Sequence, residues 1–131
     1  MEHFYVICLD TAYRVKSASL LSKGSPTDTP VYIRHIAEAA FRSGTDKVFV
    51  AHNHPGGDPK PSAKDIEVTL HIKEALDALS IQFLDHIIIA EDDYFSFVAE
   101  QLVRGDFTKE QAVRASYRTG VMQPFFPGYR K

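Results

Sequence analysis

The chain has 131 residues, of which 44% are hydrophobic and 24% are charged, and these values indicate one globular domain with its own core. The formal net charge of −2 creates no basic field, so we expect no direct binding of nucleic acid or anionic lipid. The single cysteine, Cys8, excludes a disulfide framework and favours a reducing, cytoplasmic setting. No apolar stretch approaches the roughly 20 residues of a membrane helix.

The first part of the chain predicts two strands and a helix. Residues 3–9 and 13–21 are rich in β-branched and aromatic side chains and flank a short polar turn, a pattern typical of a β-hairpin. Residues 31–42 carry apolar side chains at helical spacing, and Gly44 follows as a stop signal.

The second part continues this alternation. Residues 47–52 predict a short buried strand and residues 62–79 a regular helix, separated by the segment 53–61, which is rich in glycine and proline. Further strands are expected at 81–90 and 94–98, and a short helix at 108–117. An initial hairpin followed by strands and two helices predicts an α/β (α+β) fold with helices flanking a mixed sheet.

Two histidines stand at the end of the strand at 47–52. Side chains at positions i and i+2 of an extended chain lie on the same face, so His52 and His54 share a face. Two imidazoles placed in this way can chelate a divalent metal ion. Taken alone, such a pair is more often an ordinary polar feature of a loop.

Asp65 adds an acid to these histidines. It precedes Val68 by three residues and Ile72 by seven, so helical periodicity places it on the apolar stripe that faces the core. The stripe continues through Ala75, Leu76 and Leu79. A carboxylate that faces inward needs a cation or strong donors. With His52 and His54 it would leave a fourth tetrahedral position for water, as in catalytic zinc sites, where zinc lowers the pKa of that water.

A purely local explanation competes with metal binding. Ser62 and Asp65 match the capping-box pattern, in which each side chain bonds the other residue's backbone at the start of a helix. Ser62 could also donate a hydrogen bond to an oxyanion beside a metal ion. Two histidines on one face, a tight turn and an inward acid together favour the metal site.

The pattern His-x-His, seven residues, Ser-x-x-Asp resembles the signature of the JAB/MPN (JAMM) metalloprotease superfamily. The longer string HNHPGGDPKPSAKD, followed by LDHIII, resembles its bacterial RadC-like branch, historically called DNA repair proteins. The resemblance implies a JAB/MPN (cytidine-deaminase-like) domain and one Zn²⁺ ion held by His52, His54 and Asp65. It also implies that Ser62 stabilises a tetrahedral intermediate. We expect the RadC-like domain at residues 1–103 and a helical extension and tail at 104–131.

The general base of the superfamily has no counterpart at its expected place. The superfamily carries a glutamate on the second strand, a few residues before a glycine, and counting back from Gly24 leads to the neighbourhood of Ser19. Without a base, proton transfer would lose roughly 10²–10⁴-fold in rate. The carboxylates that could substitute, if the loop folds over the site, are Asp28, Glu38 and Asp58.

Asp85 and His86 lie within the apolar strand at 81–90. We interpret them as a buried polar pair whose hydrogen bonds are satisfied internally. The alternative is a supporting role behind a metal ligand.

Two functions are compatible with these features. The first is a zinc-dependent hydrolase that cleaves a peptide or isopeptide bond in an unidentified peptide or protein substrate. The second is a non-catalytic zinc-binding interaction module associated with DNA repair or recombination, which the missing base favours. RadC-like proteins also carry an N-terminal helix-hairpin-helix region, so the chain is either part of a longer protein or a stand-alone paralogue. A homodimer is an open alternative to a monomer.

Overall fold

The computed structural model describes residues 2–23, 29–100 and 102. The predicted helix at 108–117 and the predicted extension at 104–131 lie outside these residues. The described elements are β1 (His3–Leu9), β2 (Val15–Lys23), α1 (Thr29–Ser43), β3 (Lys47–Asn53), α2 (Ala63–Ala78), β4 (Gln82–Ile89) and β5 (Tyr94–Ser96). Their order confirms the predicted succession of strands and helices.

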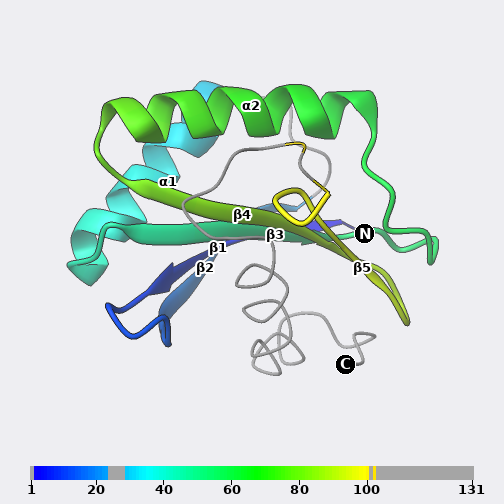
Figure 1. Cartoon of the computed structure of the whole chain (residues 1–131), viewed down its shortest axis with the longest axis horizontal. Helices are drawn as coiled ribbons and strands as arrows, with labels where there is room; N and C mark the ends of the chain where they lie inside the picture. Colours follow the sequence, from blue (N-terminus) through cyan, green and yellow to red (C-terminus); the bar gives the residue numbers. More distant parts are fainter. Residues whose placement is uncertain (1, 24–28, 101, 103–131) are drawn as a thin grey trace.

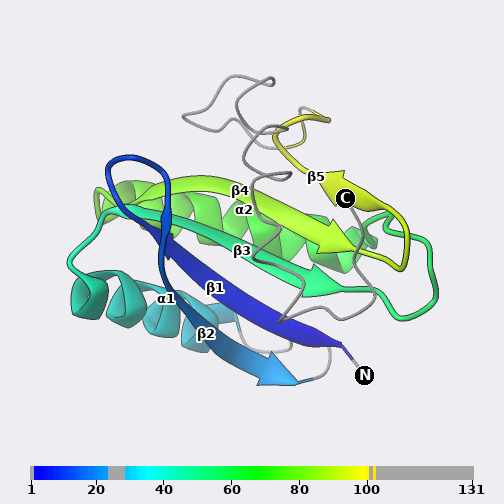
Figure 2. The same ribbon diagram turned by 90° about the horizontal axis from the view of Figure 1, so that it is seen from below.

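The strands form one mixed sheet in the order β2-β1-β3-β4-β5 (Figure 2). β1 pairs antiparallel with both β2 and β3, and β5 pairs antiparallel with β4. β3 and β4 are parallel, so the chain must cross over between them, and α2 makes that crossover. The predicted mixed sheet and its opening hairpin are therefore confirmed. β2 begins at Val15 because Tyr13, with a φ of 61°, belongs to the turn.

Both helices lie on the same face of the sheet (Figure 1). Alternate side chains of each strand point to the two faces, so Phe4, Val6 and Cys8 of β1 pack with the helices, whereas Ile7 and Leu9 join an apolar cluster on the opposite face. Burial on both faces explains why the central strands are almost uniformly apolar.

The end of α1, the start of α2 and most of the apolar stripe of α2 agree with the sequence prediction, and Leu79 is the exception. Gly44, with a φ of 67°, terminates α1 as predicted. Ser62 is the N-cap of α2. The apolar stripe of α2 is confirmed for Val68 and Ile72, but its predicted last member, Leu79, is 47% exposed. Leu79 follows the last helical turn as the C-cap residue and therefore leaves the helical phase. Neither of the described helices has the length and hydropathy needed to cross a bilayer.

Asp85 connects β4 to the chain that follows β5. Its carboxylate is 3% exposed and accepts hydrogen bonds from the hydroxyl of Ser96, from the amide of Val98 at 3.0 Å and from the amide of His86 at 2.7 Å. Burial raises the pKa of Asp85 to about 7, although these hydrogen bonds act in the opposite direction. The prediction of an internally satisfied, buried Asp85 is confirmed.

The raised pKa of Asp85 predicts a pH-dependent stability. Between the ordinary value of 3.8 and the native value of about 7, the native state holds a proton that the unfolded state has released. The contribution of Asp85 is therefore complete below pH 3.8 and is lost as the pH rises to about 7. We expect the free energy of unfolding of the wild type, relative to Asp85→Asn, to fall over this range by on the order of 4 kcal/mol.

Urea unfolding at a series of pH values measures this difference. Asp46→Asn is the matched control, because the side chain of Asp46 is 56% exposed and its removal should leave the pH profile of the wild type unchanged. Parallel profiles for the wild type and Asp85→Asn would contradict the assignment.

Candidate metal centre

Three elements bring polar side chains to one edge of the sheet. β1 runs antiparallel to β3 with Phe4 opposite His52, so the residue that precedes β1, Glu2, comes to the end of β3 where His54 lies. The loop after β3 then leads to α2, whose first turn carries Asp65. Figure 1 shows the start of β1, the end of β3 and the start of α2 on the same side of the molecule.

The potential ligand atoms of these residues lie within a few ångströms of one another. The Nε2 atoms of His52 and His54 are 3.0 Å apart. Asp65 places Oδ1 at 3.7 Å from Nε2 of His52 and Oδ2 at 3.3 Å from Nε2 of His54. Glu2 places Oε1 at 3.7 Å from Nε2 of His52. Glu2, His52 and His54 also form a group whose ligand atoms all lie within 4.8 Å of each other.

Asp65 serves the helix and the site at the same time. Its amide donates to Oγ of Ser62 at 3.0 Å, and its Oδ2 accepts from the amide of Ser62 at 2.8 Å. The capping box is thus present, yet Asp65 is only 6% exposed and faces the two histidines. The local and the metal-centred interpretations are compatible, because one carboxylate oxygen bonds the cap while both remain close to the imidazoles.

The Nδ1 atom of each imidazole has a hydrogen-bond partner in the protein. Nδ1 of His54 lies 3.1 Å from the carbonyl oxygen of Asp58 and donates to it, since a carbonyl only accepts; the neutral ring then presents a lone pair at Nε2. His52 is fully buried, and Nδ1 contacts Nε2 of His86 at 2.7 Å. Burial lowers the pKa of His52 to about 4, although the nearby Asp65 carboxylate opposes the shift. His52 is therefore neutral at pH 7, the form that binds metals.

This donor set fits a divalent cation. Nε2 of His52 lies 3.0 to 3.7 Å from Nε2 of His54 and from carboxylate oxygens of Asp65 and Glu2, and Nε2 of His54 lies 3.3 Å from Asp65. Lone pairs at such separations repel unless a cation or a proton lies between them. Two nitrogens that each lie about 2.0–2.1 Å from a tetrahedral zinc ion are about 3.3 Å apart, close to the separation of the two Nε2 atoms. The group can therefore hold a metal ion.

The four predicted site residues lie close together. His52, His54 and Asp65 converge, and Ser62 stands beside Asp65 as its cap. Ser19, which marks the expected place of the superfamily's glutamate, lies on β2 opposite Val6 of β1.

Glu2, which the sequence pattern did not single out, lies at the site together with His52 and His54. Of the substitutes considered, Glu38 is exposed on α1, and the carboxylate of Asp58 bonds the amide of Lys60 within the turn. Asp28 lies outside the described residues. The sequence shows that Glu2 directly precedes a strand. Only the pairing of that strand with β3 shows that Glu2 lies beside the two histidines.

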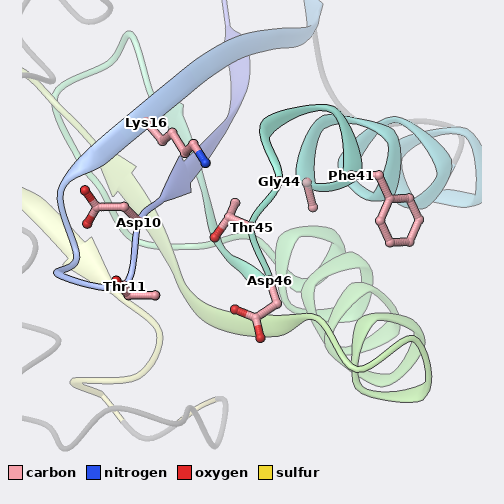
Figure 3. A pocket seen from close by; sticks show the side chains of 8 residues that line it. Asp10, Thr11, Lys16, Phe41, Gly44, Thr45 and Asp46 are labelled. Atoms are coloured by element: carbon pink, nitrogen blue, oxygen red, sulfur yellow. The ribbon is translucent and has the colours of Figure 1, made fainter.

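A separate hollow lies at the far end of the sheet (Figure 3). It is lined by Asp10, Thr11, Lys16, Ala40, Phe41, Gly44, Thr45 and Asp46. Two of its polar side chains have partners in the protein: Asp10 accepts from the amides of Ala12 and Arg14, and Thr45 donates to the carbonyl of Leu9. The lining of this hollow contains no histidine, in contrast to the opposite end of the sheet at His52.

Known proteins resemble this chain over the same region. The chain is 40% identical over 99 residues to a UPF0758 protein of Staphylococcus haemolyticus, an alignment that covers 76% of this chain and 43% of that protein. It is 40% identical over 96 residues to a UPF0758 protein of Chlorobaculum parvum, covering 73% and 43%, respectively. A UPF0758 protein of Geobacter sulfurreducens is 38% identical over 102 residues, covering 78% and 44%. The chain thus spans less than half the length of these relatives.

The sequence profile of the RadC-like JAB domain matches residues 1–102. That match includes the whole sheet, both helices and every residue of the candidate metal centre. The five-stranded mixed sheet with two helices is consistent with a JAB/MPN domain. The chain belongs to the RadC-like JAB domain family.

Proposed function

We propose that the chain is a zinc-dependent hydrolase of the JAB/MPN metalloprotease type that cleaves a peptide or isopeptide bond in a protein or peptide substrate. The observation that carries the proposal is the convergence of His52, His54 and Asp65 with a further carboxylate, Glu2, at 3.7 Å from His52. Three ligands and one spare carboxylate are what metal-assisted hydrolysis needs, because one acid completes the ligand set and the other transfers protons.

The different surroundings of the two acids support their separate roles. Asp65 is buried and its orientation is fixed by the amide of Ser62, so it suits a metal ligand. The side chain of Glu2 is 28% exposed and precedes β1, so it can accept a proton from an attacking water and return it to a leaving amine. Zinc bound at this centre would supply Lewis acidity, lowering the pKa of a water and polarising a carbonyl.

Ser62 suits the stabilisation of an oxyanion. Its Oγ accepts the amide hydrogen of Asp65 at 3.0 Å, which fixes the position of the hydroxyl. The hydroxyl hydrogen can then donate to negative charge that develops on a substrate oxygen. Cys8, the single cysteine, is buried, in keeping with the cytoplasmic setting that we propose for this reaction.

The alternative, a non-catalytic zinc-binding module associated with DNA repair or recombination, rested on a missing base. Glu2 removes that reason, because it provides a carboxylate at the centre. The formal net charge of −2 also gives no support to direct contact with nucleic acid.

Zinc binding is tested first. We expect the wild type to bind one zinc ion per chain and His54→Ala to lose it, because one of three ligands is removed. His71→Ala is the matched control, since His71 is exposed on α2. Elemental analysis after dialysis measures the metal content, and a thermal melt with added zinc measures stabilisation. Wild-type protein that holds no zinc and is not stabilised by it contradicts the proposal.

The role of Glu2 is tested separately. We expect Glu2→Gln to keep its zinc and to lose about 10²–10⁴-fold in the rate of hydrolysis, because the amide cannot accept the proton. Glu38→Gln makes the same change in charge at an exposed site on α1 and should leave the rate unchanged. Rates are measured with a library of peptide and isopeptide substrates.

The same variants separate the competing explanations. Loss of zinc from Glu2→Gln would make Glu2 a ligand and not a base. Absence of any hydrolysis by the zinc-loaded wild type across the library would favour the non-catalytic alternative.

A further inference from the structure

A line of hydrogen-bonded side chains extends from His52 into the core. Nδ1 of His52 lies 2.7 Å from Nε2 of His86, and Nδ1 of His86 lies 2.5 Å from Oγ1 of Thr69. Oγ1 of Thr69 in turn lies 2.6 Å from the carbonyl oxygen of Asp65. The line therefore starts at the backbone of one candidate ligand, Asp65, and ends on the ring of another, His52.

The carbonyl at the start sets the direction of every hydrogen bond in the line. A carbonyl oxygen only accepts, so the single hydroxyl hydrogen of Thr69 is donated to Asp65. Oγ1 of Thr69 must then accept from Nδ1–H of His86. A neutral imidazole carries one N–H, so Nε2 of His86 presents a lone pair and accepts from Nδ1–H of His52.

The surroundings keep this line neutral and rigid. Thr69, His86 and His52 are each at most 1% exposed. The ring nitrogens of His86 contact His52 and Thr69 and no carboxylate, and a buried imidazole in such surroundings stays uncharged. The ring of His86 stacks on Phe97 with centroids 4.6 Å apart, and the ring of His52 stacks on Phe4 at 5.4 Å. Neither imidazole can turn without displacing an aromatic neighbour.

We propose that Thr69 and His86 are positioning residues that hold His52 in the tautomer with its proton on Nδ1, so that the lone pair of Nε2 faces the metal centre. This inference rests on the metal site of the proposed function, but not on hydrolysis. Metal-binding histidines commonly donate their second N–H to a carboxylate or a carbonyl. Here the acceptor is a second histidine, His86, which has two tautomers of its own. The hydroxyl of Thr69 selects the tautomer of His86, and the tautomer of His86 in turn selects that of His52.

Thr69→Val tests this dependence without touching a ligand. Valine keeps the branched shape of threonine but cannot accept from Nδ1–H of His86, so His86 loses its preference for that tautomer. Once the proton of His86 moves to Nε2, His52 must carry its own proton on Nε2, where it blocks a metal ion. We expect zinc affinity to fall roughly 10- to 100-fold, the usual effect of removing such a partner. Thr69→Ser, which retains the hydroxyl, is the matched control and should keep wild-type affinity.

Two measurements on the full chain make the test. Proton–nitrogen correlation spectra of metal-free, isotope-labelled protein report which ring nitrogen of His52 is protonated, with the signal assigned by its loss in His52→Asn. Competition with a chelator of known affinity gives the zinc dissociation constant of the folded protein. A merely structural role for Thr69 would lower the melting temperature of Thr69→Val while leaving both readouts unchanged.

The outcomes are separable. Protonation of His52 at Nδ1 in the wild type and in Thr69→Ser, with partial protonation at Nε2 and weaker zinc binding in Thr69→Val, supports the inference. A wild-type His52 that carries its proton on Nε2 overturns it, even if no variant folds. Unchanged zinc affinity in Thr69→Val, or an equal loss in Thr69→Ser, also overturns it. Failure of the zinc-loaded wild type to hydrolyse any substrate counts against the proposed function alone.

Discussion

The antiparallel register between β1 and β3 is the constraint on which the site depends. It places Phe4 opposite His52, so the ring of Phe4 stacks on His52 and Glu2 arrives at the end of β3. The register itself is held by apolar side chains that alternate between two buried faces, and a shift by one residue would reverse every side chain of β1. Packing far from the polar residues therefore fixes which acid meets the histidines.

The start of α2 solves two physical problems with one residue. The first turn of a helix leaves backbone N–H groups without intrahelical partners, and the Ser62 and Asp65 pair satisfies two of them. A buried carboxylate also needs polar or charged partners, and the partners of Asp65 are His52 and His54. Because the cap orients Asp65 without a metal ion, a cation that bound beside His52 and His54 would need little further ordering of this carboxylate.

Polar groups penetrate the core on β4 without leaving unmet hydrogen bonds. Among the described residues, every buried side-chain nitrogen or oxygen has a partner. Asp85 bonds the chain beyond β5, and His86, next to it, bonds Thr69 and His52. Such networks are costly when incomplete and rigid when complete. These two neighbouring residues therefore have different roles. Asp85 fixes the segment that follows the edge strand β5, and His86 contacts His52 at the candidate site.

The sequence alone determined the order of the elements, the mixed sheet and the meeting of His52, His54 and Asp65. Local rules were enough for these features, because period-two spacing put the histidines on one face and helical spacing turned Asp65 inward. Tertiary structure alone decided which carboxylate completes the centre and what supports it from behind. Glu2 lies 50 residues before His52, and His86 lies 34 residues after it. Such neighbours are created by strand pairing and helix packing, and no local pattern encodes them.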